Sequence, residues 1–280
     1  MKKITRRSFL AAAGLSVAAL ALTACGGSSS SVASSVASSA AASSEAASTS
    51  AAAGELTTVE AGKLTMATNA TFPPYEMTTD AGDIEGIDVE TAQAIADKLG
   101  LELQIDDMDF DAALLSVQQG KADIVMAGVT VTDERKAVMD FSDSYATGIQ
   151  SIIVPEGSDI ASPDDLAGKM IGTQRGTTGY IYCSDDFGDE TVVAYDDGLT
   201  AVQALNNGQV DAVVIDNAPA KEFVAANPGL VILDTSYAEE DYAIGMAKGS
   251  SLEDAVNAVL EELKADGTLQ SIVDKYITAE

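Results

Sequence analysis

The sequence predicts an α/β protein with two similar lobes, each built on a mostly parallel sheet flanked by helices. Segments typical of strands and of amphipathic helices alternate from residue 63, and the same alternation restarts at residue 169. Residues 114–128 and 201–216 also share a helix pattern, a glycine and an acidic residue followed by an apolar strand. The alternation indicates parallel strands with helical crossovers, and the repetition indicates two lobes.

The individual elements follow from the spacing of apolar residues. Residues 86–99 have apolar side chains at helical spacing and stop before Gly100, a residue type that favours helix C-termini. The two prolines of FPPYEM (72–77) exclude a helix interior there. By the same reasoning we expect strands at 63–70, 101–105 and 122–128, a second helix at 109–120, and two C-terminal helices separated at Gly267.

The N-terminal residues 1–24 have the features of an export signal and are excluded from the fold. Two lysines and two arginines precede an apolar stretch (9–22) that is shorter than the roughly 20 residues needed to span a bilayer. The stretch ends in LTAC, which resembles the bacterial lipobox, so we expect Cys25 to carry the lipid that anchors the mature chain to the cell membrane. TRRSFL (5–10) also resembles a twin-arginine signal, and both export routes stay open. Residues 25–55 are rich in Ser and Ala and are interpreted as a flexible tether.

The composition excludes several classes of function. The leader contains four of the 15 basic residues and none of the 44 acidic ones, so the remaining chain has 11 basic residues against 44 acidic ones. This balance argues against nucleic acid as a partner, because there is no basic surface to neutralise phosphates. The acidic cluster at 106–109 lacks the pattern of a calcium loop, and we expect neither a metal nor a cofactor. With Cys25 lipidated, Cys183 has no disulfide partner and is expected to be a small apolar core residue.

Five stretches together resemble the solute-binding proteins of polar amino-acid ABC importers, such as the glutamine-, histidine- and lysine/arginine/ornithine-binding proteins. They are ATNATFPPYE (67–76), GIDVETAQAIADKLG (86–100), DFDAALLSVQQGKADIVMAGVTVTDERKAVMDFSDSY (109–145), IGTQRGTTG (171–179) and NGQVDAVVID (207–216). The resemblance implies the two-lobed type II periplasmic-binding-protein fold. Lobe 1 would contain residues 56–146 and 244–280, lobe 2 would contain 147–243, and hinge strands would cross near 145–149 and 240–244.

The resemblance also implies a site for the ligand α-carboxylate. Arg135 matches the arginine that grips this group, and a guanidinium suits the task because its rigid fork of donors fits two carboxylate oxygens. Thr130 matches a position that adds a hydroxyl and a backbone N–H. Thr177 and Thr178 match positions at a helix N-terminus that faces the anion. Taken alone, Arg135 could equally be a surface charge beside Asp133 and Glu134.

Further matches concern the rest of the ligand. Asp216 matches the aspartate that pairs with the ligand ammonium, and Gly128 matches a glycine whose carbonyl accepts from it. Phe72 and Phe110 match the aromatic pair that encloses the ligand side chain. Each has a simpler interpretation: Asp216 as a helix N-cap, and the two phenylalanines as core residues. One cation and one anion, each following a buried strand of a different lobe, nevertheless suit a zwitterion.

The expected ligand specificity depends on the residues that would surround the ligand side chain. The side chain should reach towards Asn69, Glu76 and the turn at Gln174 and Arg175. An aspartate commonly stands at the position of Asn69 in relatives that select cationic or glutamine ligands, whereas Gln174 and Ile215 stand where the glutamine subgroup has lysine and histidine. We therefore rank an uncharged polar amino acid first, a cationic one second and an acidic one third.

The resemblance implies an extracytoplasmic, lipid-anchored monomer that captures an amino acid by closure of two lobes and delivers it to an ABC-transporter permease. Two alternatives use the same fold: a ligand-sensing domain, and an enzyme with dehydratase or cell-wall lytic activity. The chain has no histidine and no nucleophile–base pair at recognisable spacing, so we expect binding and no catalysis.

Overall fold

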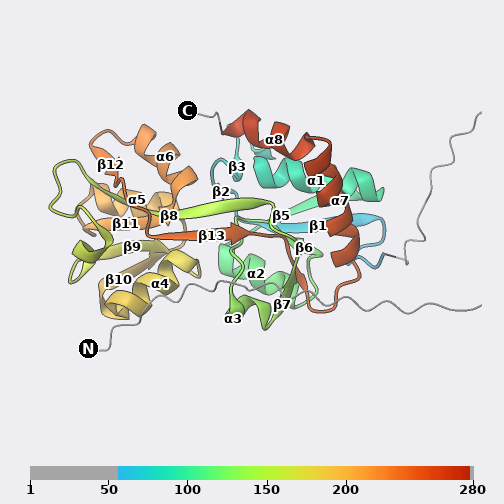
Figure 1. The fold of residues 1–280 in the computed structure, drawn as a ribbon, viewed down its shortest axis with the longest axis horizontal. Helices are drawn as coiled ribbons and strands as arrows, with labels where there is room; N and C mark the ends of the chain where they lie inside the picture. The colour runs from blue at the N-terminus through green and yellow to red at the C-terminus, as the bar shows by residue number, and fades with distance from the viewer. Residues whose placement is uncertain (1–55, 278–280) are drawn as a thin grey trace, which may run out of the picture. The chain divides into compact units, whose positions relative to one another are not determined.

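The computed structural model describes residues 56–277. The predicted signal peptide, Cys25 and the tether lie outside these residues. The described residues form two central sheets, helices that pack on them, and a small third sheet (Figure 1). Within 56–277, no helix combines the length and the apolar character that a membrane crossing requires.

The first sheet has the strand order β5-β1-β6-β14-β7. Its strands are β1 (Lys63–Thr68), β5 (Glu102–Asp107), β6 (Ile124–Val125), β7 (Met139–Phe141) and β14 (Gly245–Ala247). Alternating side chains of β1 enter two cores, because successive residues of a strand point to opposite faces. Leu64 and Met66 pack with residues of α1 (Ile87–Leu99), α7 (Glu253–Ala265) and α8 (Thr268–Tyr276), whereas Ala67 packs with residues of α2 (Phe110–Gln118).

The second sheet has the order β10-β9-β11-β8-β12, and β13 also pairs with β8. Its strands are β8 (Ala146–Pro155), β9 (Ile171–Gln174), β10 (Val192–Tyr195), β11 (Ala212–Asp216), β12 (Leu230–Ile232) and β13 (Ala238–Tyr242). Residues of α5 (Gly198–Asn206) and α6 (Asn217–Ala226) join one core, and residues of α4 (Thr178–Phe187) join the other. Cys183 is fully buried in the latter, as an apolar core residue would be. Two short 3₁₀ helices, η1 (Pro163–Leu166) and η2 (Asp189–Thr191), complete this part.

In each sheet, only three neighbouring strands are parallel to one another. β5, β1 and β6 are parallel, as are β10, β9 and β11. The returning strands β14, β7, β8, β12 and β13 pair antiparallel, so both sheets are mixed. The prediction of parallel strands therefore holds for the strand–helix–strand units and not for the five returning strands.

Two antiparallel strands, β8 and β13, connect the sheets (Figure 1). The chain leaves the first sheet after β7, enters β8 at Ala146, and returns from β13 at Tyr242 into β14. These crossings lie where the hinge strands were expected, at 145–149 and 240–244.

The small sheet consists of β2 (Thr71–Phe72), β3 (Glu76–Thr78) and β4 (Ile84–Glu85). It is held against the start of α1 by a close approach of two backbones. The amide of Asp88 donates to the carbonyl of Tyr75 at 2.9 Å. A Cβ at Gly86 would lie 2.1 Å from the same carbonyl oxygen, so only glycine allows this contact. The first turn of α1 is thereby placed beside Glu76.

Candidate functional site

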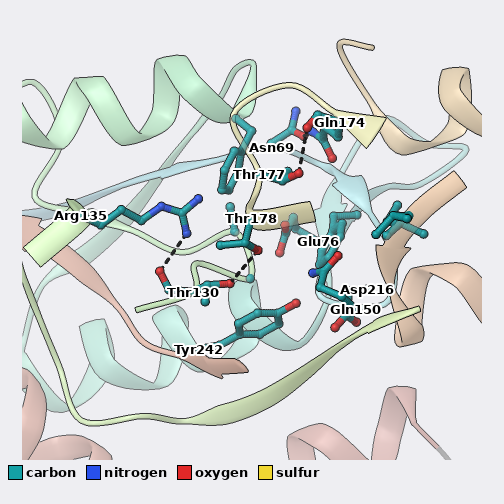
Figure 2. Close-up of a pocket in the computed structure, with 16 residues that line it drawn as sticks. Asn69, Glu76, Thr130, Arg135, Gln150, Gln174, Thr177, Thr178, Asp216 and Tyr242 are labelled. Carbon is teal, nitrogen blue, oxygen red and sulfur yellow. Dashed lines mark hydrogen bonds between the residues drawn. The ribbon is translucent and has the colours of Figure 1, made fainter. Parts of the chain in front are cut away.

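A pocket lies between the two sheets (Figure 2). Asn69 follows β1, Gly128 follows β6, Gln174 ends β9 and Asp216 ends β11, so the pocket lies at the carboxyl ends of parallel strands from both sheets. This is the usual place for a ligand in open α/β sheets. All ten predicted ligand-binding residues line the pocket, including Phe72, Phe110, Thr130, Arg135, Thr177 and Thr178.

Arg135 is buried, with 8% of its surface exposed, which contradicts the alternative of a surface charge. It lies in the short helix α3 (Asp133–Lys136), whose N-cap hydroxyl, that of Thr132, accepts from the Arg135 amide at 3.1 Å. Its guanidinium donates to the carbonyl of Thr130 at 2.8 Å (Figure 2) and, across the pocket, to the carbonyl of Gly176 at 3.1 Å. It also lies over the Phe110 ring, 5.4 Å from the centroid.

The electrostatic state of Arg135 is unusual for a buried cation. Burial lowers its pKa, and the charge of Glu240 acts in the opposite direction. No ion pair with a carboxylate forms at Arg135 among residues 56–277. Because a buried charge is normally paired, this guanidinium is suited to receive an anion from outside the chain.

Two hydroxyls meet in the pocket that Arg135 also lines, one from the loop after β6 and one from the start of α4. The Oγ1 atoms of Thr130 and Thr178 lie 3.4 Å apart (Figure 2), and the Thr130 hydroxyl also donates to Glu240 at 3.1 Å. Thr178 is the first residue of α4, and Thr177 is its N-cap, accepting from the amide of Tyr180 at 3.3 Å. The positive end of a ten-residue helix therefore borders the pocket near the guanidinium.

Asp216 is a helix N-cap, as one interpretation of the sequence suggested, and its side chain also lines the pocket. One carboxylate oxygen accepts from the Ala218 amide at 2.9 Å and caps α6, and the other accepts from the Ile149 amide of β8 at 2.7 Å. The carboxylate nevertheless lines the pocket and is only 2% exposed. Burial raises its pKa, while the two amides and the Tyr242 hydroxyl lower it. Capping fixes its orientation, and the lone pairs that remain can accept from a ligand.

Asn69 and Gln174 lie opposite each other and bond directly across the pocket. The Gln174 amide donates to Asn69 Oδ1 at 2.8 Å (Figure 2) and to the carbonyl of Asp196 at 3.3 Å. The Asn69 amide donates to the carbonyl of Met108 at 3.0 Å, and Thr71 donates to its oxygen at 2.9 Å. One bond therefore joins the two side chains, and other groups of the chain engage the rest of the Asn69 amide and the second Gln174 donor.

The carboxylate of Glu76, in contrast to the amides of Asn69 and Gln174, makes no hydrogen bond within the described residues. The residue is fully buried and lines the pocket. Burial and the nearby Asp88 raise its pKa well above the usual range. Arg175, the other residue expected at this end, does not line the pocket. Its guanidinium points to Asp196, at 3.4 Å.

Phe72 and Phe110 both line the pocket and have different neighbours. Phe72 stacks on Tyr75 with ring centroids 5.8 Å apart, whereas Phe110 lies beneath Arg135. Gly128 has a φ of +55°, and a Cβ there would meet the Phe72 ring at 2.8 Å. The missing side chain thus allows the backbone after β6 to approach this ring.

Sequence reasoning did not assign roles to two lining residues of the hinge strands, Gln150 and Tyr242. The Gln150 amide donates to Glu240 at 2.9 Å, and Tyr242 packs edge-on against Tyr75 with centroids 5.4 Å apart. A polar Gln–Ser pair inside the apolar strand GIQSIIV (148–154) was the available signal for Gln150. Residues 56–277 contain no group of three or more His, Cys, Asp or Glu side chains that could hold a metal ion.

Comparison with known proteins places this architecture in a family. The chain is 33% identical over 226 residues to the L-cystine-binding protein TcyJ of Escherichia coli (strain K12), covering 79% of this chain and 85% of that protein. It is 34% identical over 230 residues to the arginine-binding extracellular protein ArtP of Bacillus subtilis (strain 168), covering 78% and 87%. The structure matches that of the arginine-, lysine-, histidine-binding protein ArtJ from Geobacillus stearothermophilus with a TM-score of 0.75 and 34% identity, covering 78% of this chain and 96% of that one. Residues 64–279 match the family as a whole, and the chain belongs to the bacterial extracellular solute-binding proteins, family 3.

Proposed function

We propose that this protein captures a cationic amino acid between its two sheets and delivers it to an ABC importer. The observation that carries the proposal is the set of buried ionisable groups that line the pocket without ion pairs: the guanidinium of Arg135 and the carboxyls of Asp216 and Glu76. Their number and signs complement a ligand with one carboxylate and two positive groups.

The carboxylate of the ligand would bind at Arg135. Two of the guanidinium N–H groups are used by backbone carbonyls, at Thr130 and Gly176, which leaves the others of its five donors for the ligand. The hydroxyls of Thr130 and Thr178 and the N-terminus of α4 add donors on the same side. Binding there would complete a charge pair that the chain alone leaves open.

The α-ammonium would bind at Asp216. This carboxylate is held by backbone amides and is 2% exposed, so an ammonium group would gain a preoriented acceptor at low dielectric. The carbonyl of Gly128 borders the same pocket. The roles expected for Asp216 and Gly128 from the family resemblance therefore become part of this proposal.

The end of the pocket that would hold the ligand side chain favours a cation, which reverses the ranking made from the sequence. That ranking placed an uncharged ligand first because Asn69 replaces an aspartate. In the structure Asn69 bonds to Gln174 instead, and Glu76 is the lining residue whose oxygens lack a donor. Two relatives point the same way, since their names describe binding of arginine and of arginine, lysine and histidine.

Delivery would use the hinge strands β8 and β13. Contacts made from both sheets at once favour the closed arrangement, and Arg135–Gly176 and Asn69–Gln174 are hydrogen bonds of this kind. A lipid on Cys25 and a tether over residues 25–55 would keep a monomeric binding protein beside its permease on the outer face of the cell membrane. No catalytic step is part of this proposal.

A thermal-shift panel of the common amino acids, with ornithine, citrulline and cystine, tests the proposal. Arginine, lysine or ornithine at 100 times its Kd should stabilise the protein by about 2.7 kcal/mol. Neutral amino acids should give smaller shifts at equal concentration. Shifts only with neutral or acidic amino acids would refute the cationic class, and no shift with any of them would refute amino-acid binding.

A further inference from the structure

Two carboxyl side chains lie close together at one end of the pocket, and Glu76 is the one of the two that lines it. Glu76 in β3 and Asp88 in the first turn of α1 are both fully buried. Their proximity follows from the backbone contact at Gly86, which holds the start of α1 against the Tyr75–Glu76 segment. Asp88 Oδ2 accepts from the amide of Gly128 at 3.0 Å, so this acid pair also touches the backbone that borders the ligand.

Three of the four oxygens of the acid pair lack an ordinary donor. Both oxygens of Glu76 and Oδ1 of Asp88 are without a hydrogen-bond partner among the described residues. Neither residue forms an ion pair with a lysine or arginine in 56–277. Buried acceptors of this kind are costly unless something donates to them. A proton held between the two carboxyls supplies the missing donor.

The surroundings make double ionisation unfavourable. The groups that face the pair are Tyr145 ahead of β8, Tyr75 beside β3, and Asp107 at the end of β5. All are acidic or phenolic, so they add no compensating cation. Burial raises the pKa of Asp88, although the Gly128 amide and the Tyr145 hydroxyl act in the opposite direction, and burial together with Asp88 and Asp107 raises the pKa of Glu76 further. Like charges in contact at low dielectric cannot both be ionised, as in other paired carboxyls.

We infer that Glu76 and Asp88 share one proton in the ligand-free protein, and that the cationic side chain of a bound amino acid displaces this proton into solvent. This inference rests on the proposed function. The step balances: a protonated pair and a cationic ligand become an ionised pair with the bound cation, and one proton is released. No covalent bond other than that to the proton changes.

The displaced proton makes affinity depend on both pH and ligand charge. Because proton and ligand cation compete for the acid pair, affinity for arginine rises about tenfold per pH unit while the pair holds its proton, and becomes constant once the pair is ionised. Citrulline, the uncharged analogue of arginine, does not displace the proton. Its affinity should stay nearly constant over the same range.

Isothermal titration calorimetry of the full chain with arginine and with citrulline tests the inference. Binding enthalpies measured at one pH in phosphate and in Tris differ in proportion to the protons released, because the two buffers take up a proton with different enthalpies. Arginine should release about one proton more than citrulline near neutral pH. The citrulline titration corrects for any proton change at Asp216 or Arg135, since both ligands present the same α-groups.

Variants locate the proton. Glu76→Gln should abolish the excess proton release, flatten the pH dependence, and weaken arginine at least tenfold more than citrulline. Glu85→Gln, at an exposed position on the neighbouring strand β4, is the control and should behave as the parent. Arginine binding with equal enthalpies in both buffers and no pH dependence would overturn the shared proton while leaving the proposed function intact. Failure of every amino acid to bind would overturn both, and the parent measurements decide the matter even if Glu76→Gln does not fold.

Discussion

Removing the charge of Arg135 should abolish most ligand affinity with little effect on the fold. The change Arg135→Met keeps an unbranched apolar stem over Phe110 and deletes the guanidinium. Of the five N–H donors, Thr130 and Gly176 use one each, which leaves three, and a bidentate carboxylate needs two. Charged hydrogen bonds contribute about 1.5–3 kcal/mol each, and truncating one partner of a buried charge pair costs about 2–5 kcal/mol. The dissociation constant should therefore rise about 30- to 5,000-fold.

Stability should change much less, because no carboxylate in the described residues pairs with Arg135 in the absence of ligand. Two backbone carbonyls lose a donor, whereas a buried unpaired cation is removed, and we expect these effects to cancel to within about 1 kcal/mol. Calorimetric titration with arginine and urea unfolding of the ligand-free protein measure the two quantities. Arg175→Met, which removes an exposed guanidinium on the neighbouring turn, is the control and should change affinity less than about threefold. Affinity within threefold of the parent in Arg135→Met, or equal losses in both variants, would refute the role of Arg135.

Three further predictions concern the hinge, the acid pair and the anchor. Gly148→Ala places a Cβ 2.4 Å from the Tyr242 ring. The free energy of unfolding, measured in urea, should fall by about 1–3 kcal/mol because the site is overpacked. An unchanged unfolding midpoint would show that the hinge strands move apart at no cost. Burial raises the pKa of Asp88 to about 6 in the folded protein, so its protonated form contributes stability that is lost as the pH rises from about 4 to about 6. Over this window the free energy of unfolding of the parent should fall relative to that of Asp88→Asn, and parallel curves would contradict the shift. Labelled palmitate should enter the protein through Cys25, and labelling that persists in Cys25→Ala would exclude this anchor.

Much of the fold could be predicted because local patterns and tertiary structure agree. The helix expected at 86–99 is α1, and Gly100 ends it with a left-handed φ of 71°. The strand expected at 122–128 is shorter, since only Ile124–Val125 pair as β6. The residues after β6 are buried like a strand but leave the sheet, and Gly128 adopts a positive φ with its amide held by Asp88. An apolar run indicates burial, and it cannot show where the ladder of hydrogen bonds ends.

The candidate site could be predicted residue by residue only through the family resemblance, and its pairings could not. Asn69 and Gln174 are 105 residues apart, and their bond depends on how the two sheets face each other. Asp88 has the sequence pattern of a favourable acid in a first helical turn. Its burial arises from the packing of β3 and Tyr145 around it, which no local pattern records.

The central claim is that one pocket recognises three charges of a single small ligand. The most direct test is calorimetric titration of the parent protein with arginine and with three analogues that each lack one charge: agmatine without the carboxylate, Nα-acetylarginine without the ammonium, and citrulline without the guanidinium. Arginine should bind at least about 100-fold more tightly than agmatine and Nα-acetylarginine, because each analogue leaves a buried charge, at Arg135 or Asp216, without its partner. Citrulline should also bind more weakly than arginine, and the ratio of the two dissociation constants should grow as the pH rises. Agmatine or Nα-acetylarginine binding as tightly as arginine would contradict the account.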